Sequence, residues 1–458
     1  MKMLELLASA YLFLAMSTQA GDVFSSLEFR NEQKELGIPS TPPALQHVAF
    51  AGTAPVLDGK LDDACWQTAQ EFMPFSVRRL KRLAIEQRHV KACFDQEHIY
   101  FGIVCDKAPE HALLTRTTWN DDAQIWKDDE LEIFLDPALR HVQYYQLILN
   151  SAGNVFDASH TVSWVQDPAA AELAFKKKRD TDKSWDSQVK LKVRVHEQTW
   201  VVELALPVRA MGVPGVPLGA KWGLQVTSAN RRTGELTNWV PCDWHDPASY
   251  GQIWLGEPQL DVTGLSFGAA AYGRNRFGAT LAPLAGAGRY NVAVTVSDAV
   301  GTRKAEKSFT LTAGTPREIE VPYTIAAKRG EAKAEVVVTD PNGRMVYYSV
   351  QRGAVPPLLG LTVRPYGQFT DVREVKGKAT INLGALSRQE MELQAVLSGP
   401  GGERTERIVD IDGTTLEFGL ETAALRPGIQ TLKVRLLDAA GTEVGVQEAS
   451  FALVEPPL

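Results

Sequence analysis

The chain has 458 residues, which is enough for about three domains of ordinary size. Its 44% hydrophobic and 22% charged residues exclude a disordered chain and a chain embedded in a membrane. A net charge of −7 spread over this length disfavours non-specific attraction to nucleic acid, so we expect no nucleic-acid partner.

The N-terminus has the pattern of an export signal. Met1 and Lys2 form a positive start, residues 6–16 are apolar, and Ala20 is a small residue suited to cleavage before Gly21. The apolar stretch is about half of what spans a bilayer, so residues 1–20 predict a cleavable signal peptide and a secreted or periplasmic protein that does not span the membrane. Residues 21–45 end in a proline-rich run and are interpreted as a linker.

Residues 46–257 have the pattern of β-strands. Residues 90–95 and 99–105 flank a short polar turn and predict a hairpin, and residues 130–136 alternate with Leu131, Ile133 and Leu135 on one face. Residues 144–150, 190–195, 200–206 and 222–227 are further strands, whereas only residues 62–72 and 208–211 indicate helix. We therefore predict an antiparallel β-sandwich whose core includes Trp66, Trp200 and Trp222.

The four cysteines give no clear disulfide pattern. Cys93 and Cys105 flank the predicted hairpin turn at offsets that do not place them opposite each other. For these two cysteines, and for Cys65 and Cys242, we therefore expect buried free thiols at least as readily as disulfide bridges. No cysteine or histidine spacing fits a structural zinc site.

A change in composition marks a domain boundary near Glu257. All ten Trp, all four Cys and all eight His precede it. Beyond it, turn sequences at residues 298–301 and 340–343 are repeated about one hundred residues later, at 398–402 and 438–441. This repeat predicts two immunoglobulin-like β-sandwiches, residues 258–356 and 357–458, so the expected fold class is all-β throughout.

No catalytic motif is complete. Residues 264–268 read GLSFG and match a nucleophile elbow formally, but no helix pattern follows, and the last histidine of the chain, His245, precedes them. Metalloprotease, phosphate-loop and dinucleotide motifs are missing from the sequence. We therefore expect a protein without chemistry of its own.

Several segments of residues 46–257 resemble the family 9 carbohydrate-binding module, a β-sandwich of the DOMON-like superfamily. They are residues 55–66 (PVLDGKLDDACW), 126–137 (WKDDELEIFLDP), 144–153, 200–207, 219–224 and 245–251. The resemblance covers nearly half the chain. It implies that an oligosaccharide or polysaccharide is the partner, in the context of polysaccharide breakdown beside glycoside hydrolases.

The resemblance also implies a slot in which two facing indoles grip a sugar unit. Indole planes cover the faces of a sugar ring, and charged or amide groups bond its hydroxyls. The residues it implies are Trp126 and Glu132, Asn150, Trp239 with Trp244 as the alternative second wall, and Arg231. Arg231 is included because Ile148 stands where the family's sugar binder has an arginine.

Two other kinds of ligand remain open. Asp58, Asp62 and Asp63 surround Gly59 and offer oxygen ligands for a structural Ca²⁺, although aspartate is also common in turns.

Sandwiches of related shape also bind haem non-covalently in exported electron-transfer proteins, for which the axial candidates are Met73, His89, Met211 and His245. A third reading is a structural envelope protein without a ligand. The immunoglobulin-like domains are a further candidate surface for a protein partner.

Overall fold

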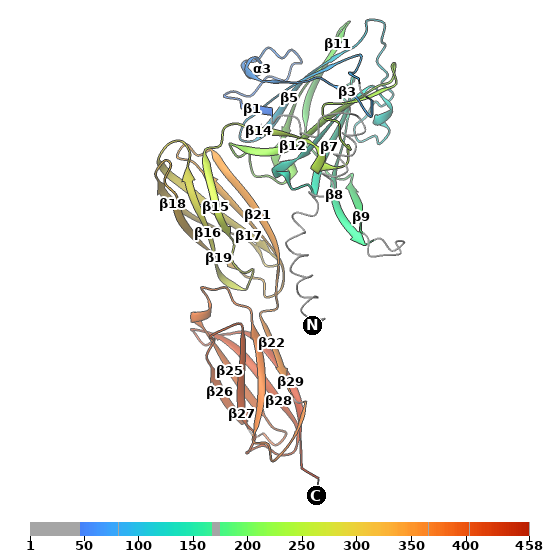
Figure 1. The fold of residues 1–458 in the computed structure, drawn as a ribbon. Coiled ribbons are helices and arrows are strands. Elements are labelled where there is room, and N and C mark those ends of the chain that lie inside the picture. Colours follow the sequence, from blue (N-terminus) through green and yellow to red (C-terminus); the bar gives the residue numbers. More distant parts are fainter. Residues whose placement is uncertain (1–45, 81, 167–174, 365, 403, 458) are drawn as a thin grey trace. The chain divides into compact units, whose positions relative to one another are not determined.

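The computed structural model describes residues 46–80, 82–166, 175–364, 366–402 and 404–457 (Figure 1). The predicted signal peptide and linker lie outside these residues. Strands dominate, and the all-β prediction is confirmed. Within the described ranges, no helix combines the length and the apolar character needed to cross a bilayer.

The chain divides into two compact units, Met1–Pro258 and Gln259–Leu458. The first unit contains two sheets. One sheet is formed by β14 (Gly251–Leu255), β12 (Ala220–Asn230), β6 (Glu130–Asp136), β7 (Gln143–Asn150), β8 (Val155–Gln166) and β9 (Phe175–Asp182), with β13 (Glu235–Asn238) and β3 (Ser76–Val77) extending it beside β12. The other is formed by β10 (Lys190–Val195), β11 (Thr199–Pro207), β5 (His98–Asp106) and β4 (Arg88–Phe94), with β2 (Glu71–Phe72) beside β4.

Strand β1 (Gln46–Phe50) joins the two sheets. Residues 46–48 pair in parallel with β14, and Ala49 and Phe50 pair in parallel with β4. One five-residue strand therefore closes the seam between both layers of the first unit.

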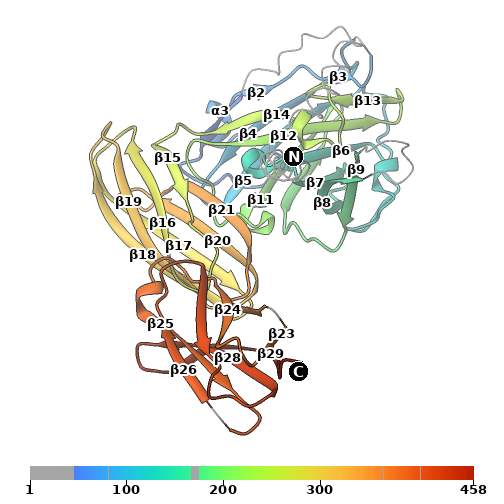
Figure 2. The same cartoon turned by 60° about the horizontal axis from the view of Figure 1, so that its bottom comes forward.

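The core of the first unit lies between these layers. Successive side chains of a strand point to opposite faces, so Leu131, Ile133 and Leu135 all enter the core from β6. The indoles assigned to the core from the sequence are at most 1% exposed: Trp66, Trp200 and Trp222. Strand β6 pairs with β12 along one edge and with β7 along the other, and all three strands are labelled in Figure 2.

The predicted hairpin forms as β4 and β5, and the Asp95 carboxylate accepts hydrogen bonds from the amides of Glu97 and His98 in its turn. Cys93 pairs with Tyr100 rather than with Cys105, and all four cysteines are buried free thiols.

The helix expected over residues 62–72 is shorter, because the chain turns extended after α3 (Ala64–Thr68) and enters β2. The other helical segments are single 3₁₀ turns: η1 (Ile125–Lys127), η2 (Pro137–Leu139), η3 (Val208–Met211), η4 (Pro247–Ser249) and η5 (Arg388–Glu390).

The second unit contains four sheets. The first pair consists of β15 (Leu260–Ser266), β16 (Gly273–Pro283) and β19 (Arg317–Ile325), opposite β18 (Gly301–Leu311), β17 (Gly288–Asp298), β20 (Gly330–Thr339) and β21 (Met345–Val355). The second pair consists of β22 (Leu359–Val363), β24 (Glu374–Ile381) and β27 (Thr415–Glu421), opposite β23 (Gly367–Phe369), β29 (Glu443–Val454), β28 (Gly428–Asp438), β25 (Met391–Ser398) and β26 (Arg404–Val409). Strands β24 and β27 bury alternate residues, as expected for a sheet with one face in water.

Candidate functional site

The outer face of the first sheet is polar but buried. On β6 this face carries Glu130 and Glu132, the residues between those that enter the core. Thr227 of β12 lies opposite Glu132 in the ladder and also opposite Asn238 of β13. Residues directly opposite in an antiparallel ladder share a face, so Glu132, Thr227 and Asn238 form one row across the sheet. We call this row, together with Glu130, the polar floor.

Several polar atoms of the floor have no hydrogen-bond partner among the described residues, although they are buried. They are Glu130 Oε2, Thr227 Oγ1 and Asn238 Oδ1. A buried polar group without a partner costs about 1–3 kcal/mol, and groups of this kind in one place are unusual in a folded domain. The floor therefore has both donors and acceptors to offer to a polar ligand.

The two glutamates of the floor are electrostatically unusual. Burial raises the pKa of Glu132 to about 7, although a hydrogen bond from Gln146 and the charges of Arg78 and Arg231 act to lower it. Burial, reinforced by the charge of Glu132, raises the pKa of Glu130 well above its usual range. Burial thus favours the protonated form of Glu130, which can donate a hydrogen bond, while Glu132 is close to its midpoint near neutral pH.

A hydrogen-bonded chain leads away from Glu132 along β7 and β8. Gln146 Nε2 donates to Glu132 Oε2 at 2.6 Å, and His160 Nε2 lies 2.8 Å from Gln146 Oε1. The other ring nitrogen of His160 lies 3.0 Å from Thr181 Oγ1 on β9. Burial lowers the pKa of His160 to about 4, so the imidazole is neutral and its two nitrogens can serve as one donor and one acceptor.

Trp244 lies beside the floor in the segment that follows β13. Its ring packs against the guanidinium of Arg78, with the Arg78 Cζ atom 4.4 Å from the ring centroid. Trp244 is 8% exposed, and its Nε1 has no hydrogen-bond partner in the described part of the chain; nor has Nε of Arg78. Arg78 covers one face of the Trp244 indole. The N–H of the same indole is a buried donor that a ligand could use.

Trp126 occupies the rim of the same face. It belongs to η1, and its side chain is 49% exposed. Arg231, which follows β12, donates from Nε to the carbonyl of Asp128 at 3.0 Å and from Nη2 to the carbonyl of Trp126. The guanidinium of Arg231 therefore fixes the backbone that carries Trp126, and the structure brings these two predicted residues together.

Asn150 stabilises the chain at the end of β7 through its side-chain hydrogen bonds. Its side-chain amide donates to the carbonyl of Thr117 and to Asp128 Oδ2, both at 3.1 Å, and its Oδ1 accepts from the amides of Ala152 and Asn154. All of these contacts are within the protein. Ile148, where the resemblance would have an arginine, is buried in an apolar cluster with Ile125 and Phe156.

Trp239 points away from the polar floor. It follows Asn238 on the chain, so it leaves the sheet on the other side. Its ring stacks on Phe72 with centroids 5.2 Å apart and fills the space above Gly251. Of the two candidates for the second wall, Trp244 is therefore the one that lies beside the floor.

The three aspartates considered for calcium do not converge. Asp58 forms an ion pair with Lys60 at 2.5 Å, and Asp63 accepts a hydrogen bond from the amide of Val56. No group of three or more His, Cys, Asp or Glu side chains suited to a metal ion occurs in the described residues. The carboxylate that organises this turn is the buried Glu203, which accepts from the Trp66 indole and the amide of Gly59.

The histidines considered for haem already have polar contacts within the protein. His89 contacts Glu71 on the second sheet, whereas His245 Nδ1 lies 2.8 Å from the hydroxyl of Tyr144 over the first. Of the two methionines, Met73 is 43% exposed and Met211 is buried. Met73 directly follows β2, whose partner strand β4 carries His89, whereas Met211 belongs to η3 and His245 lies over the first sheet.

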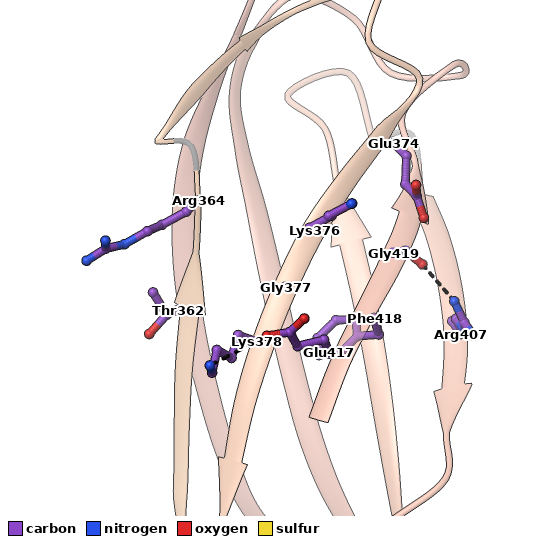
Figure 3. A pocket seen from close by; sticks show the side chains of 10 residues that line it. All are labelled: Thr362, Arg364, Glu374, Lys376, Gly377, Lys378, Arg407, Glu417, Phe418 and Gly419. Atoms are coloured by element: carbon purple, nitrogen blue, oxygen red, sulfur yellow. Dashed lines mark hydrogen bonds and ion pairs between the residues drawn. The ribbon is translucent and has the colours of Figure 1, made fainter. Parts of the chain in front are cut away.

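The second unit has a hollow of about 680 Å³ on the outer face of the β22–β24–β27 sheet (Figure 3). Its charged lining comprises Arg364, Glu374, Lys376, Lys378, Arg407 and Glu417. Phe418 is the aromatic residue of the lining, and its ring is buried in the sandwich core at 4% exposure. The hollow thus lacks an exposed aromatic face such as Trp126 provides.

Sequence reasoning missed Arg78, Thr227, Asn238 and Gln146. Each joins the floor through strand pairing, a side-chain hydrogen bond or a loop, and no local sequence pattern reports such contacts. Trp119 is a surface residue with 61% of its side chain exposed.

Residues 57–257 match the family model described as "Carbohydrate family 9 binding domain-like". This match confirms the resemblance for that part of the chain. Two solved structures of a family 9 carbohydrate-binding module from Caldicellulosiruptor kristjanssonii are similar, in complex with cellotriose and with glucose. Both are 15% identical with a TM-score of 0.32 and cover 46% of this chain, and 93% and 95% of their own chains. No curated protein matches the chain.

Proposed function

We propose that the first unit binds carbohydrate: a sugar unit stacks on the half-exposed Trp126, displaces the segment that covers the polar floor, and is then seated between Trp126 and Trp244. The observation that supports this most directly is the set of unpartnered buried atoms on Glu130, Thr227 and Asn238 beside the unpartnered indole N–H of Trp244. Sugar hydroxyls are both donors and acceptors, so they satisfy such a mixed set. The family match over residues 57–257 and the carbohydrate complexes of similar proteins agree with this proposal.

Each floor residue has a role in this proposal. Glu132, when ionised, accepts hydrogen bonds from two hydroxyls, and such charge-assisted bonds are the strong ones. Thr227 and Asn238 bond the same sugar from below. The half-exposed Trp126 covers an apolar face of the ring, and burial of that face contributes about 25 cal/mol per Å².

The proposal also assigns a role to the other segments of the chain. In the proposal, residues 1–20 direct export, and the two C-terminal sandwiches are immunoglobulin-like spacers that project the first unit or bind a partner protein. The whole is a non-catalytic DOMON-like accessory protein of polysaccharide breakdown beside glycoside hydrolases.

Replacement of Thr227 by valine tests the floor. Valine keeps the shape of threonine but lacks the hydroxyl, and Oγ1 of Thr227 has no partner in the described protein. We therefore expect Thr227→Val to leave the free protein as stable as the wild type or up to about 2 kcal/mol more stable. Its affinity for the sugar should fall by about tenfold, the worth of one hydrogen bond.

The measurement is calorimetric titration of the full chain with glucose, cellobiose, xylobiose and a wider glycan panel. Trp126→Ala should abolish binding, and Trp254→Phe is the matched control, because that indole donates to the carbonyl of Gly219 elsewhere in the unit. A folded wild-type chain that binds no glycan would refute the proposal and favour a structural protein.

A further inference from the structure

A second exposed indole lies on the same loop as Trp126. Trp119 is 61% exposed and Trp126 is 49% exposed, and the other indoles whose burial is described are buried or only partly exposed. Tryptophan is highly buried on average because its large apolar surface is costly in water. Two indoles held in solvent on one loop are therefore a feature that calls for a ligand of matching chemistry.

The base of this loop is closed by buried carboxylates. The Asp128 carboxylate accepts hydrogen bonds from the amides of Arg116 and Thr117, at 2.9 and 3.0 Å. The next residue, Asp129, exchanges hydrogen bonds with Leu114: its Oδ2 accepts from the Leu114 amide, and its own amide donates to the Leu114 carbonyl. Asp128 and Asp129 are at most 2% exposed, so water does not compete for these bonds.

The far side of the loop is fixed as well. The amide of Val155 donates to Asn120 Oδ1 at 3.0 Å, and the amide of Asp121 donates to the carbonyl of Val155 at 2.8 Å. Ile125 is fully buried in an apolar cluster that includes Phe156. The loop is thus held at its base and along its length, and the two indoles are exposed by a rigid backbone.

Chain geometry limits the distance between the two indoles. Trp119 is two residues beyond Thr117, and Trp126 is two residues before Asp128, and Thr117 and Asp128 are hydrogen-bonded. Since an extended residue spans at most about 3.6 Å, the Cα atoms of the two tryptophans are no more than roughly 22 Å apart. A short oligosaccharide can span even this upper limit, so one glycan chain can contact both indoles.

We infer that Trp119 forms an additional subsite for a glycan chain that extends from the sugar unit at Trp126. This inference rests on the proposed function and adds the class of ligand, an oligosaccharide or polysaccharide segment of several units rather than an isolated sugar. Trp119 stacks on a unit of the chain outside the polar floor. The site is pre-organised, because the loop that carries Trp119 is already fixed in the free protein.

The test compares short and long ligands on the full chain by calorimetric titration, with cellobiose against cellohexaose and xylobiose against xylohexaose. For the wild type we expect the binding hexasaccharide to bind about tenfold more tightly than its disaccharide, which corresponds to about 1.4 kcal/mol. Trp119→Ala should remove this advantage and leave the disaccharide affinity unchanged within about twofold.

Three variants make the outcome specific. Trp119→Phe keeps an aromatic face and should retain part of the advantage. Thr118→Ala alters an exposed neighbour and should retain all of it. Trp126→Ala should abolish binding of both ligand lengths.

Equal affinities for short and long ligands, or an unchanged hexasaccharide affinity in Trp119→Ala, would overturn the inference and leave the proposed function intact. A wild-type chain that binds no glycan of any length would overturn both.

Discussion

Replacement of Glu132 by glutamine should change how the stability of the first unit depends on pH. Burial raises the pKa of Glu132 from its usual 4.5 to about 7, so the folded unit holds the proton more tightly than the unfolded chain does. The resulting stability is complete below about pH 4.5 and is lost as pH rises to about 7. A rise of this size corresponds to about 3 kcal/mol.

Glutamine is neutral at every pH and can still accept the hydrogen bond from Gln146. The free energy of unfolding of Glu132→Gln, relative to the wild type, should therefore rise by about 3 kcal/mol between pH 4.5 and pH 8. Urea denaturation followed by tryptophan fluorescence measures this in the full chain, because all ten tryptophans lie in the first unit.

Glu197→Gln is the matched control, since it removes one carboxylate from an exposed position on the same unit. Its pH profile should run parallel to that of the wild type. If Glu132→Gln also runs parallel to the wild type, Glu132 is not buried in the way described, and the electrostatic account of the floor is wrong.

Two further predictions concern packing and charge. Gly251→Ala would place a methyl group 2.5 Å from the Trp239 ring and should lower the free energy of unfolding of the first unit, measured by urea denaturation, by about 1–3 kcal/mol. Gly52→Ala is the control and should not lower it, because no atom lies within 4 Å of the added methyl group. Equal stabilities of the two variants would mean that Trp239 packs elsewhere. Burial acts to raise the pKa of Asp298, but the ion pair with Arg303 and three backbone amides outweigh it and hold the pKa at about 2. The stability that the ionised Asp298 contributes is present above pH 3.8 and is lost as pH falls towards 2. Asp298→Asn should therefore lower the free energy of unfolding of the second unit, measured by calorimetry, by about 2 kcal/mol at pH 7 and by little at pH 2. An equal loss at both pH values would contradict the argument.

The local pattern of the sequence predicted much of the fold. Alternation over residues 130–136 placed Leu131, Ile133 and Leu135 in the core and Glu132 on the other face, as β6 shows. What alternation could not indicate is that the second face is buried too. Loops from distant parts of the chain cover it, and a period of two cannot distinguish water from a covering loop.

The candidate site shows the same limit. The resemblance implied Trp239 as the second wall, with Trp244 as the alternative. Trp239 directly follows Asn238 at the end of β13, and this offset of one residue turns it away from the floor. Thr227 meets Glu132 through the pairing of β12 with β6, across about one hundred residues of chain. Such pairings are set by the whole fold, so no local motif could indicate that Thr227 lies opposite Glu132.

The seam formed by β1 bears on how the first unit can be isolated. The family match begins at residue 57, beyond the end of β1 at Phe50. A fragment cut at the bounds of that match would lose the strand that pairs with both β14 and β4, and would expose two open strand edges at once. Open edges are templates for pairing with other chains, so such a fragment should aggregate, and a soluble first unit has to begin ahead of Gln46.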